Sequence, residues 1–302
     1  MKLQAAMEYL STYGWAILII VIAILGFYEL GIFNSYTYAP KATTGSCSVN
    51  RVSVAGLSRY SLVGPCKNEI PEYVLNIQGE YYINYISIPS TSSDSFNGPI
   101  TISFWIRVVN TTPACLNGFL QKQAGTSAAN YWYYLDINSA TGGCGLRNPA
   151  AVYPLATDNG VWGVNVGGSN VAYNMGNPAL WYSVIWSYNY STGGTLYING
   201  VEQGGAGGGG PLGQTTAPIL INAAGNDYEL SNLQIYNTSL SSAEVQSLYS
   251  EGIGGIPTDI PNLAGWWPLN GNANDYSGNG NNGKSYGSVS FVSNWETGYT
   301  AP

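Results

Sequence analysis

The first apolar segment of the chain lies at its N-terminal end. Residues 9–33 (YLSTYGWAILIIVIAILGFYELGIF) contain a single ionisable side chain, Glu29, and residues 15–28 contain none. As an α-helix this segment would be about 38 Å long at about 1.5 Å per residue, whereas the hydrocarbon core of a bilayer is about 30 Å thick. The pattern therefore predicts one long hydrophobic α-helix, over residues 4–33, that spans a membrane.

After residue 33 the pattern changes to short runs in which apolar and polar positions alternate, separated by Gly, Ser, Thr and Asn. This alternation is typical of β-strands that bury one face. The predicted strands cover residues 73–77, 81–88, 100–109, 118–122, 132–137, 161–166, 181–188, 195–198, 219–221, 228–236 and 263–269. Many strands with turns about every ten residues predict a mainly β, two-sheet antiparallel sandwich.

Two local motifs fix individual boundaries. Asn199-Gly200 lies between apolar runs and predicts a type I′ hairpin turn. Ser241 with Glu244 three residues later forms a capping box that opens one short helix, over residues 243–249.

Composition restricts the classes of function. The 302 residues are 8% charged and 13% aromatic, with a net charge of −7 and no histidine. Nine Lys plus Arg side chains are too few for the basic stripe that nucleic acid requires, so no nucleic-acid partner is expected. Without histidine the chain has no Ser-His-Asp triad and no imidazole ligand for a catalytic zinc.

The residues before the apolar run form a recognisable motif. QAAMEYLSTYGWAILIIVI, beginning at Gln4, resembles the class III signal of archaeal type IV pilins, in which a short leader is removed and the fifth residue of the mature chain is a glutamate. A cut before Gln4 removes a leader of residues 1–3 and makes Glu8 that fifth residue, although Leu3 stands where the family usually has a small residue. The resemblance implies membrane insertion and then assembly with copies of the chain or other pilins, with the Gln4 amine paired to Glu8 of a neighbour. The alternative is an uncleaved membrane anchor.

The position of Lys2 indicates the orientation. It lies on the short side of the apolar run, so the positive-inside rule places the N-terminus in the cytoplasm and the rest of the chain outside the cell. The predicted localisation is the cell membrane and the extracellular surface.

Four ordered segments carry a second resemblance, to the laminin-G-like (concanavalin A-like) jelly roll: residues 100–106, 180–188, 195–201 and 233–241. The resemblance implies a jelly-roll domain over residues 73–302, after a cysteine-containing connector over residues 34–72. The fold hosts lectins, adhesion modules and glucanases, so it does not by itself give the function.

The order of the segments indicates a circular permutation. Residues 265–283 (GWWPLNGNANDYSGNGNNG) resemble the motif that usually opens such a domain, yet here they follow the short helix. The strand over residues 263–269 then closes the sheet of its own chain, or it pairs with a neighbouring subunit in a domain swap.

The carboxylates argue against an enzyme. Glucanases of this fold use closely spaced carboxylates, as in E-x-D-x-x-E, because retaining cleavage needs an acid and a nucleophile about 5 Å apart. The chain has no such triplet. No catalytic residue is therefore expected.

Glycans are the expected ligands of the domain, and five residues are candidates to bind them: Trp132, Tyr134, Trp162, Tyr173 and Asn174. Residues 132–134 are consecutive aromatics, so alternation places at least one on the outer face of its sheet. The alternative is that aromatic residues of the domain fill the core or cover the surface. Under that interpretation the sandwich core includes Trp105, Trp181, Trp186 and Trp266.

A structural Ca²⁺ is a candidate cofactor. Asp275, Ser277 and Asn279 form an oxygen-rich loop, and the resemblance places Asn232 near it where relatives commonly have acidic residues. The alternative is that Asp275 accepts hydrogen bonds within a Gly/Asn turn.

The four cysteines, Cys47, Cys66, Cys115 and Cys144, allow three disulfide pairings. An external location favours disulfides, and pairing of nearest neighbours joins Cys47 to Cys66 and Cys115 to Cys144. Free buried thiols are the alternative.

Three N-x-S/T sequons offer glycosylation sites outside the cell, at Asn110, Asn189 and Asn237. Together these patterns predict a non-enzymatic, pilus-like filament subunit or adhesin that displays a lectin-like jelly roll. The alternative is a monomeric, membrane-tethered carbohydrate-binding module.

Overall fold

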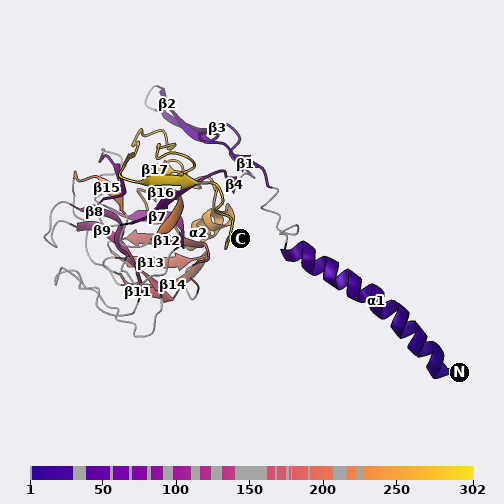
Figure 1. The fold of residues 1–302 in the computed structure, drawn as a ribbon. Helices are drawn as coiled ribbons and strands as arrows, with labels where there is room; N and C mark the ends of the chain where they lie inside the picture. The colour runs from indigo at the N-terminus through magenta and orange to yellow at the C-terminus, as the bar shows by residue number, and fades with distance from the viewer. Residues whose placement is uncertain are drawn as a thin grey trace. The chain divides into compact units, whose positions relative to one another are not determined.

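The computed structural model forms two compact units, Met1–Pro40 and Lys41–Pro302, shown in Figure 1. The residues it describes are 2–29, 39–54, 57–67, 70–79, 83–90, 98–109, 116–123, 131–139, 162–166, 169–174, 177, 179–189, 191–206, 216–222 and 227–302.

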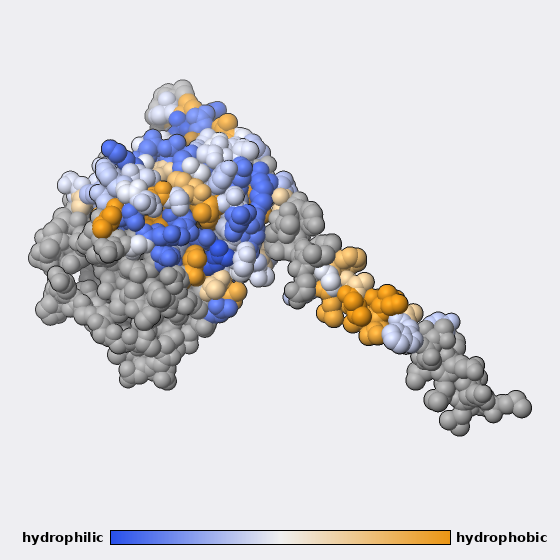
Figure 2. Space-filling model, viewed as in Figure 1, coloured by the Kyte–Doolittle hydropathy of each residue, from blue (hydrophilic) through white to orange (hydrophobic). Residues whose placement is uncertain are grey.

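The first unit contains helix α1, Lys2–Glu29. Gln4 and Glu8 lie on this helix, but their side chains and residues 30–38 lie outside the described part of the chain. Large apolar side chains between Tyr13 and Tyr28 are exposed, Trp15 by 68%, and the aliphatic ones among them are orange in Figure 2. Within the described residues, no helix meets the length and hydropathy that a membrane span requires.

The second unit contains two large β-sheets, which confirms the mainly β sandwich. The seven-stranded sheet has the order β11 (Ser169–Asn174), β10 (Trp162–Val166), β9 (Tyr131–Ser139), β8 (Leu116–Gln123), β15 (Ile219–Asn222), β6 (Tyr85–Ile88), β18 (Lys284–Tyr286). The eight-stranded sheet has the order β14 (Val201–Ala206), β13 (Gly193–Ile198), β12 (Tyr182–Asn189), β7 (Ile100–Val108), β16 (Tyr228–Tyr236), β5 (Val74–Ile77), β19 (Val289–Val292), and β17 (Leu263–Trp267) also pairs with β16.

Alternation along the strands builds the core between the sheets. On β7 the even-numbered residues from Ile100 to Val108 are fully buried in one hydrophobic cluster. Residues of the other sheet meet them there: Ile86, Ile88, Leu120, Ile219 and Ile221. Each fully buried aliphatic side chain stabilises the fold by about 1.5–3 kcal/mol.

The tryptophans are distributed differently from the prediction. Trp186 lies in the cluster between the sheets, whereas Trp266 belongs to a second cluster formed with α2 (Ser242–Ser250). Trp105 stacks on Tyr249 of α2, with ring centroids 5.9 Å apart. The prediction that all four fill the sandwich core was wrong because side chains alternate along a strand: Phe104 occupies the inner face, so Trp105 takes the outer one.

The C-terminal strands complete both sheets within the same chain. β17 pairs antiparallel with the second half of β16, with Leu233 opposite Trp267, while β5 pairs with the first half. β18 and β19 add to β6 and β5. β17 ends at Trp267, before the predicted boundary, and Leu269 has a left-handed φ of 57° that extended strands do not adopt.

Local motifs were predicted more accurately than the connector. The capping box is confirmed, with Ser241 and Glu244 bonded reciprocally, and Asn199 and Gly200 have the φ angles of 50° and 74° that a type I′ turn requires. The connector contains structure that the sequence analysis missed. β2 (Ser48–Val54) and β3 (Leu57–Val63) form a hairpin, and β1 (Lys41–Ala42) pairs with β4 (Ile70–Pro71).

Candidate functional site

The predicted ligand-binding residues come together on three adjacent strands at one edge of the seven-stranded sheet. Trp132 and Tyr134 lie on β9, Trp162 on β10, and Tyr173 and Asn174 on the edge strand β11. The register places Trp162 opposite Ser139 and Asn174 opposite Gly163. Their side chains lie outside the described part of the structure. The backbone register places Tyr134 and Asn174 on one face of the sheet and Trp162 and Tyr173 on the other.

Strand β8 brings a further polar residue beside them. Gln121 lies opposite Tyr134 of β9 on one side and Leu220 of β15 on the other. Its neighbour Leu120 is in the core, so alternation directs Gln121 to the outer face of the sheet. The Gln121 side chain is 1% exposed, and neither its nitrogen nor its oxygen has a hydrogen-bond partner among the residues that the structure describes.

Lys122 occupies the opposite face of the same strand. It is fully buried, and its Nζ donates to Ser90 Oγ at 2.9 Å. Sequence reasoning missed both polar residues of this strand. The available signal was the Gln-Lys pair at the end of the predicted strand over residues 118–122.

The outer face of the eight-stranded sheet carries a buried ion pair. Arg107 Nη2 lies 2.6 Å from Glu229 Oε2, and both side chains are at most 10% exposed. Burial raises the pKa of the Glu229 carboxyl above its ordinary value, while Arg107 and a hydrogen bond from Asn76 oppose the shift. The guanidinium also lies 5.6 Å from the ring of Trp181. The ion pair joins β7 to β16, where Arg107 and Glu229 lie opposite each other, and this structural role explains it.

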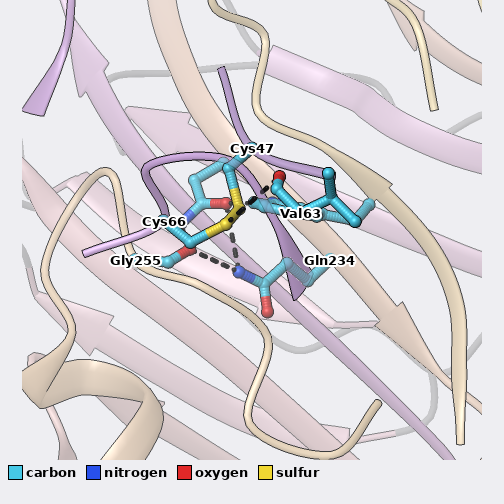
Figure 3. The surroundings of a disulfide bond; sticks show 7 residues. Cys47, Val63, Cys66, Gln234 and Gly255 are labelled. Carbon is cyan, nitrogen blue, oxygen red and sulfur yellow. Dashed lines mark hydrogen bonds between the residues drawn. A yellow bond between two sulfur atoms is a disulfide. The ribbon is translucent and has the colours of Figure 1, made fainter. Parts of the chain in front are cut away.

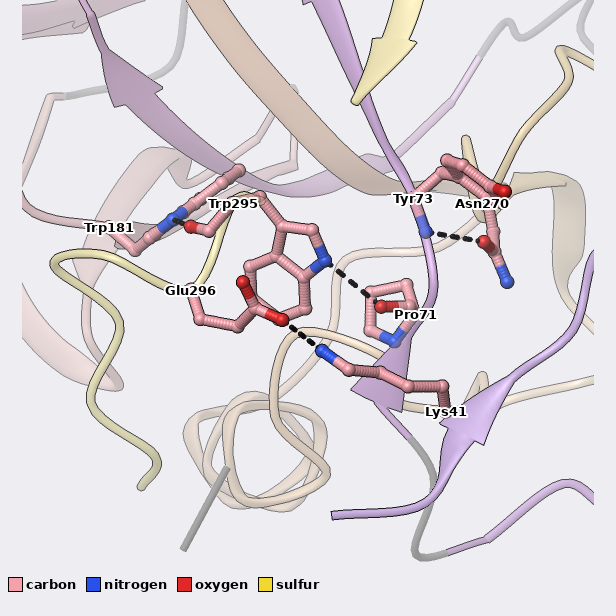
Figure 4. Close-up of polar contacts among 7 residues, drawn as sticks. All are labelled: Lys41, Pro71, Tyr73, Trp181, Asn270, Trp295 and Glu296. Atoms are coloured by element: carbon pink, nitrogen blue, oxygen red, sulfur yellow. Dashed lines mark hydrogen bonds and ion pairs between the residues drawn. The ribbon is translucent and has the colours of Figure 1, made fainter. Parts of the chain in front are cut away.

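The C-terminal segment covers part of the same face (Figure 4). Trp181 Nε1 donates to the Trp295 carbonyl at 2.9 Å, and Trp295 Nε1 donates to the Pro71 carbonyl at 3.0 Å. Lys41 forms an ion pair with Glu296. These contacts hold residues 295 and 296 against β1, β4 and the residue that precedes β12.

The residues predicted to bind calcium are engaged in hydrogen bonds of their own loop. Asp275 Oδ1 accepts from the Trp266 and Ser277 amides, and its Oδ2 accepts from the Asn281 amide. The Asn279 side chain directs its NH₂ group to the carbonyls of residues 263 and 264. Both Asp275 oxygens accept hydrogen bonds from backbone amides, and Asn279 donates with its NH₂ group. These residues therefore do not fit a Ca²⁺ site, which requires about six to eight oxygen ligands directed at the ion.

Asn232, the fourth predicted calcium ligand, has a structural role on β16. It has a left-handed φ of 54° at the bulge between Ser231 and Gln234. Its Oδ1 accepts from Trp266 Nε1 at 2.8 Å and from Gln234 Nε2 at 3.0 Å, and its Nδ2 donates to the Gly255 carbonyl. The amide thus links β16, β17 and the segment after α2.

The predicted disulfide between Cys47 and Cys66 is confirmed, and it lies near Gln234 and Gly255 in Figure 3. It lines a small pocket of about 40 Å³ together with Asn232, Trp266 and Tyr276. One water molecule needs about 10–15 Å³, so the pocket has room for about three waters and is too small to enclose a sugar ring. Cys115 and Cys144 lie outside the described residues.

The sequons differ in accessibility. Asn237 is exposed, just after β16. Asn189 ends β12, and its Oδ1 accepts from the Ser191 amide and hydroxyl. Asn110 lies outside the described part of the chain. Of the two sequon asparagines that the structure describes, Asn237 is the more exposed.

Comparisons with known proteins address the second unit. The profile of a family described as the concanavalin A-like lectin/glucanases superfamily matches residues 82–246, more than half of the chain. A comparison with curated proteins returns no match.

Several solved structures are similar to the chain. A protein of Bacteroides ovatus ATCC 8483 proposed to bind carbohydrate is 18% identical, with a TM-score of 0.48, over 82% of this chain and 69% of that one. The native heptameric SAP-like pentraxin of Limulus polyphemus is 12% identical, with a TM-score of 0.47, over 74% and 97%. The binding domain of Paraclostridial Mosquitocidal Protein 1 is 16% identical, with a TM-score of 0.39, over 67% of this chain, which spans less than half (45%) of that one.

Proposed function

Because the chain belongs to the concanavalin A-like lectin/glucanases superfamily, we propose that its jelly roll binds glycans and catalyses no reaction. The observation that carries this proposal is the placement of Trp132, Tyr134, Trp162, Tyr173 and Asn174 on the adjacent strands β9, β10 and β11, where the register puts Tyr134 and Asn174 on the same face of the sheet. Aromatic rings offer flat apolar surfaces to sugar rings, and the asparagine amide can bond sugar hydroxyls.

A matched pair of tyrosine substitutions tests this site. Tyr134 lies on β9 and Tyr286 on the edge strand β18, and the register places both on the outer face of the same sheet. We expect Tyr134→Ala to reduce binding on a glycan array at least tenfold and Tyr286→Ala to leave it unchanged. Equal loss in both variants, or no glycan bound by the wild type, would contradict the proposed function.

We further infer that α1 holds the chain at the cell membrane, with its N-terminus in the cytoplasm, and then packs with copies of itself in a filament. The resemblance of residues 4–22 to type IV pilins supports this inference. The exposed apolar side chains between Trp15 and Tyr28 support it as well, because an apolar surface of this extent needs lipid or protein to cover it. Tethering of a monomer is the alternative.

Substitution of the two acidic residues of α1 separates assembly from tethering. Glu8→Ala should abolish filaments seen by electron microscopy of the expressed protein, because the pairing with the Gln4 amine is lost. Glu29→Ala, at the other end of α1, is the control and should leave filaments intact. Monodisperse wild-type particles contradict assembly, and an intact mass that still includes Met1 contradicts cleavage before Gln4.

A further inference from the structure

We propose that the hairpin of β2 and β3 binds a second copy of the chain, on the acidic surface that Glu202, Glu244 and Glu251 form in that copy. The contact joins the jelly rolls of two copies, so it goes beyond the proposed packing of α1 helices and does not require it. Its basis is a basic and apolar face of the hairpin in a chain whose jelly roll is strongly acidic.

Charge is divided unevenly along the chain. Residues 34–68 contain four basic side chains and no acidic one, whereas residues 69–302 contain four basic and fourteen acidic ones. Two of the basic side chains in the first range, Arg59 and Lys67, are exposed and form no ion pair within the described part of the chain. Exposed cations of this kind favour an acidic partner, because complementary charge steers association and fixes its register.

The two faces of the hairpin have different surroundings. Val52 lies opposite Arg59 on one face, so Arg51 lies on the other. Arg51 donates to backbone carbonyls of its own jelly roll, with Nε at 2.6 Å and Nη2 at 2.7 Å, and Val49 of the same face is buried. The face of Arg59 therefore points away from the domain. The disulfide that joins the two ends of the hairpin holds it in this geometry, which lowers the entropy cost of binding.

Apolar side chains surround Arg59 on this outward face. Leu57 is 69% exposed, Val63 51% and Val52 43%, and all three share the face with Arg59. Leu57 is the most exposed large apolar side chain among the described residues of the second unit. Both strands of this two-stranded sheet also have a free edge within the described residues. Exposed apolar groups on unpaired strands are typical of a protein–protein contact.

The acidic surface complements this face in both charge and polarity. Three acidic side chains are exposed in the part of the chain that the structure describes: Glu202 on β14, Glu244 in the first turn of α2 and Glu251 at its end. α2 donates a hydrogen bond to the turn that precedes β14, so all three belong to one surface. Val201, which is 60% exposed, adds an apolar side chain beside Glu202. Because the hairpin and this surface are different parts of the domain, the contact is heterologous and repeats from copy to copy into a filament or a ring.

A charge swap in the full chain tests the contact. A nonionic detergent covers the apolar surface of α1, and sedimentation velocity at low salt then measures the remaining self-association. Arg59→Glu and Glu202→Arg should each weaken association at least tenfold, because each places like charges opposite one another. The double variant should recover most of the association, since opposite charges face each other again. Lys284→Glu is the control, because it reverses an exposed basic side chain on β18, outside both surfaces, and it should associate as wild type does.

The outcomes separate this contact from the filament formed through α1. Wild-type association in Arg59→Glu overturns the inference and leaves the hairpin to a partner other than this chain. A double variant no better than the single ones overturns it as well, and so does equal weakening by Lys284→Glu, because net charge then governs association. A wild type that stays monomeric in detergent overturns it and leaves α1 assembly intact. Glu8→Ala should associate as wild type does in detergent, so a loss in that variant assigns the association to α1 and overturns the inference.

Discussion

Gly265 on β17 tests whether the C-terminal strand closes the sandwich as the structure shows. A Cβ added there would lie 2.1 Å from the ring of Trp267, which is 1% exposed and donates to the Asn281 carbonyl at 2.9 Å. Real Cβ contacts require about 3 Å or more, so Gly265→Ala must displace the ring by about 1 Å.

The magnitude combines three effects. Overpacking of a buried ring costs about 1–3 kcal/mol, and a weakened indole hydrogen bond costs about 0.5–1.5 kcal/mol. The lower entropy of the unfolded alanine chain offsets about 0.4–1 kcal/mol. We expect a net loss of about 2 kcal/mol in the free energy of unfolding, or about 5 °C in Tm for a domain of this size.

Denaturation of the full chain, followed by tryptophan fluorescence, measures this loss. The matched control is Gly98→Ala, because a Cβ at Gly98 meets no atom within 4 Å. The control should change the free energy of unfolding by less than about 0.5 kcal/mol. If Gly265→Ala is equally neutral, Trp267 does not pack on Gly265, and the placement of β17 beside β16 is incorrect.

Three further predictions concern stability. Replacing Cys47 and Cys66 by serine should lower the free energy of unfolding by about 3 kcal/mol in the chain-entropy model, since the disulfide spans 19 residues; urea denaturation that shows no loss contradicts this. Ser241→Ala should cost about 1 kcal/mol at neutral pH. That cost should shrink in acid, because hydrogen bonds from Ser241 lower the pKa of Glu244, and the stability they contribute is lost as pH falls through the folded pKa. Burial raises the pKa of Glu229, so its contribution is fully present below the ordinary carboxyl pKa and is lost as pH rises through the folded value. The advantage of wild type over Glu229→Gln in unfolding free energy should therefore decrease as the pH rises above the ordinary carboxyl pKa of about 4; an advantage that grows with pH contradicts the shift.

The local elements could be predicted from the sequence because their causes are local. The boundaries of residues 228–236 were predicted without error, since an alternating apolar run defines them. The hairpin of β2 and β3 was missed because it buries little: most of β3 is exposed, so no apolar alternation marks it. The ligand residues were predicted individually from their type, and their positions on adjacent strands follow from pairings that no local pattern specifies.

The sequence by itself determined the class of the fold, the short helix with its capping box, the type I′ turn and the family of the jelly roll. Only the tertiary structure decided which face of each strand lies inside. It placed Trp105 outside and Trp186 inside, and it directed three backbone amides at the Asp275 carboxylate. Within the described part of the chain, it left Gln121 without a hydrogen-bond partner, whereas Gln234 has three. The physical reason is that periodicity along a strand is a property of neighbouring residues. Burial and hydrogen-bond satisfaction depend instead on groups that are far apart in the sequence and meet only when two sheets pack.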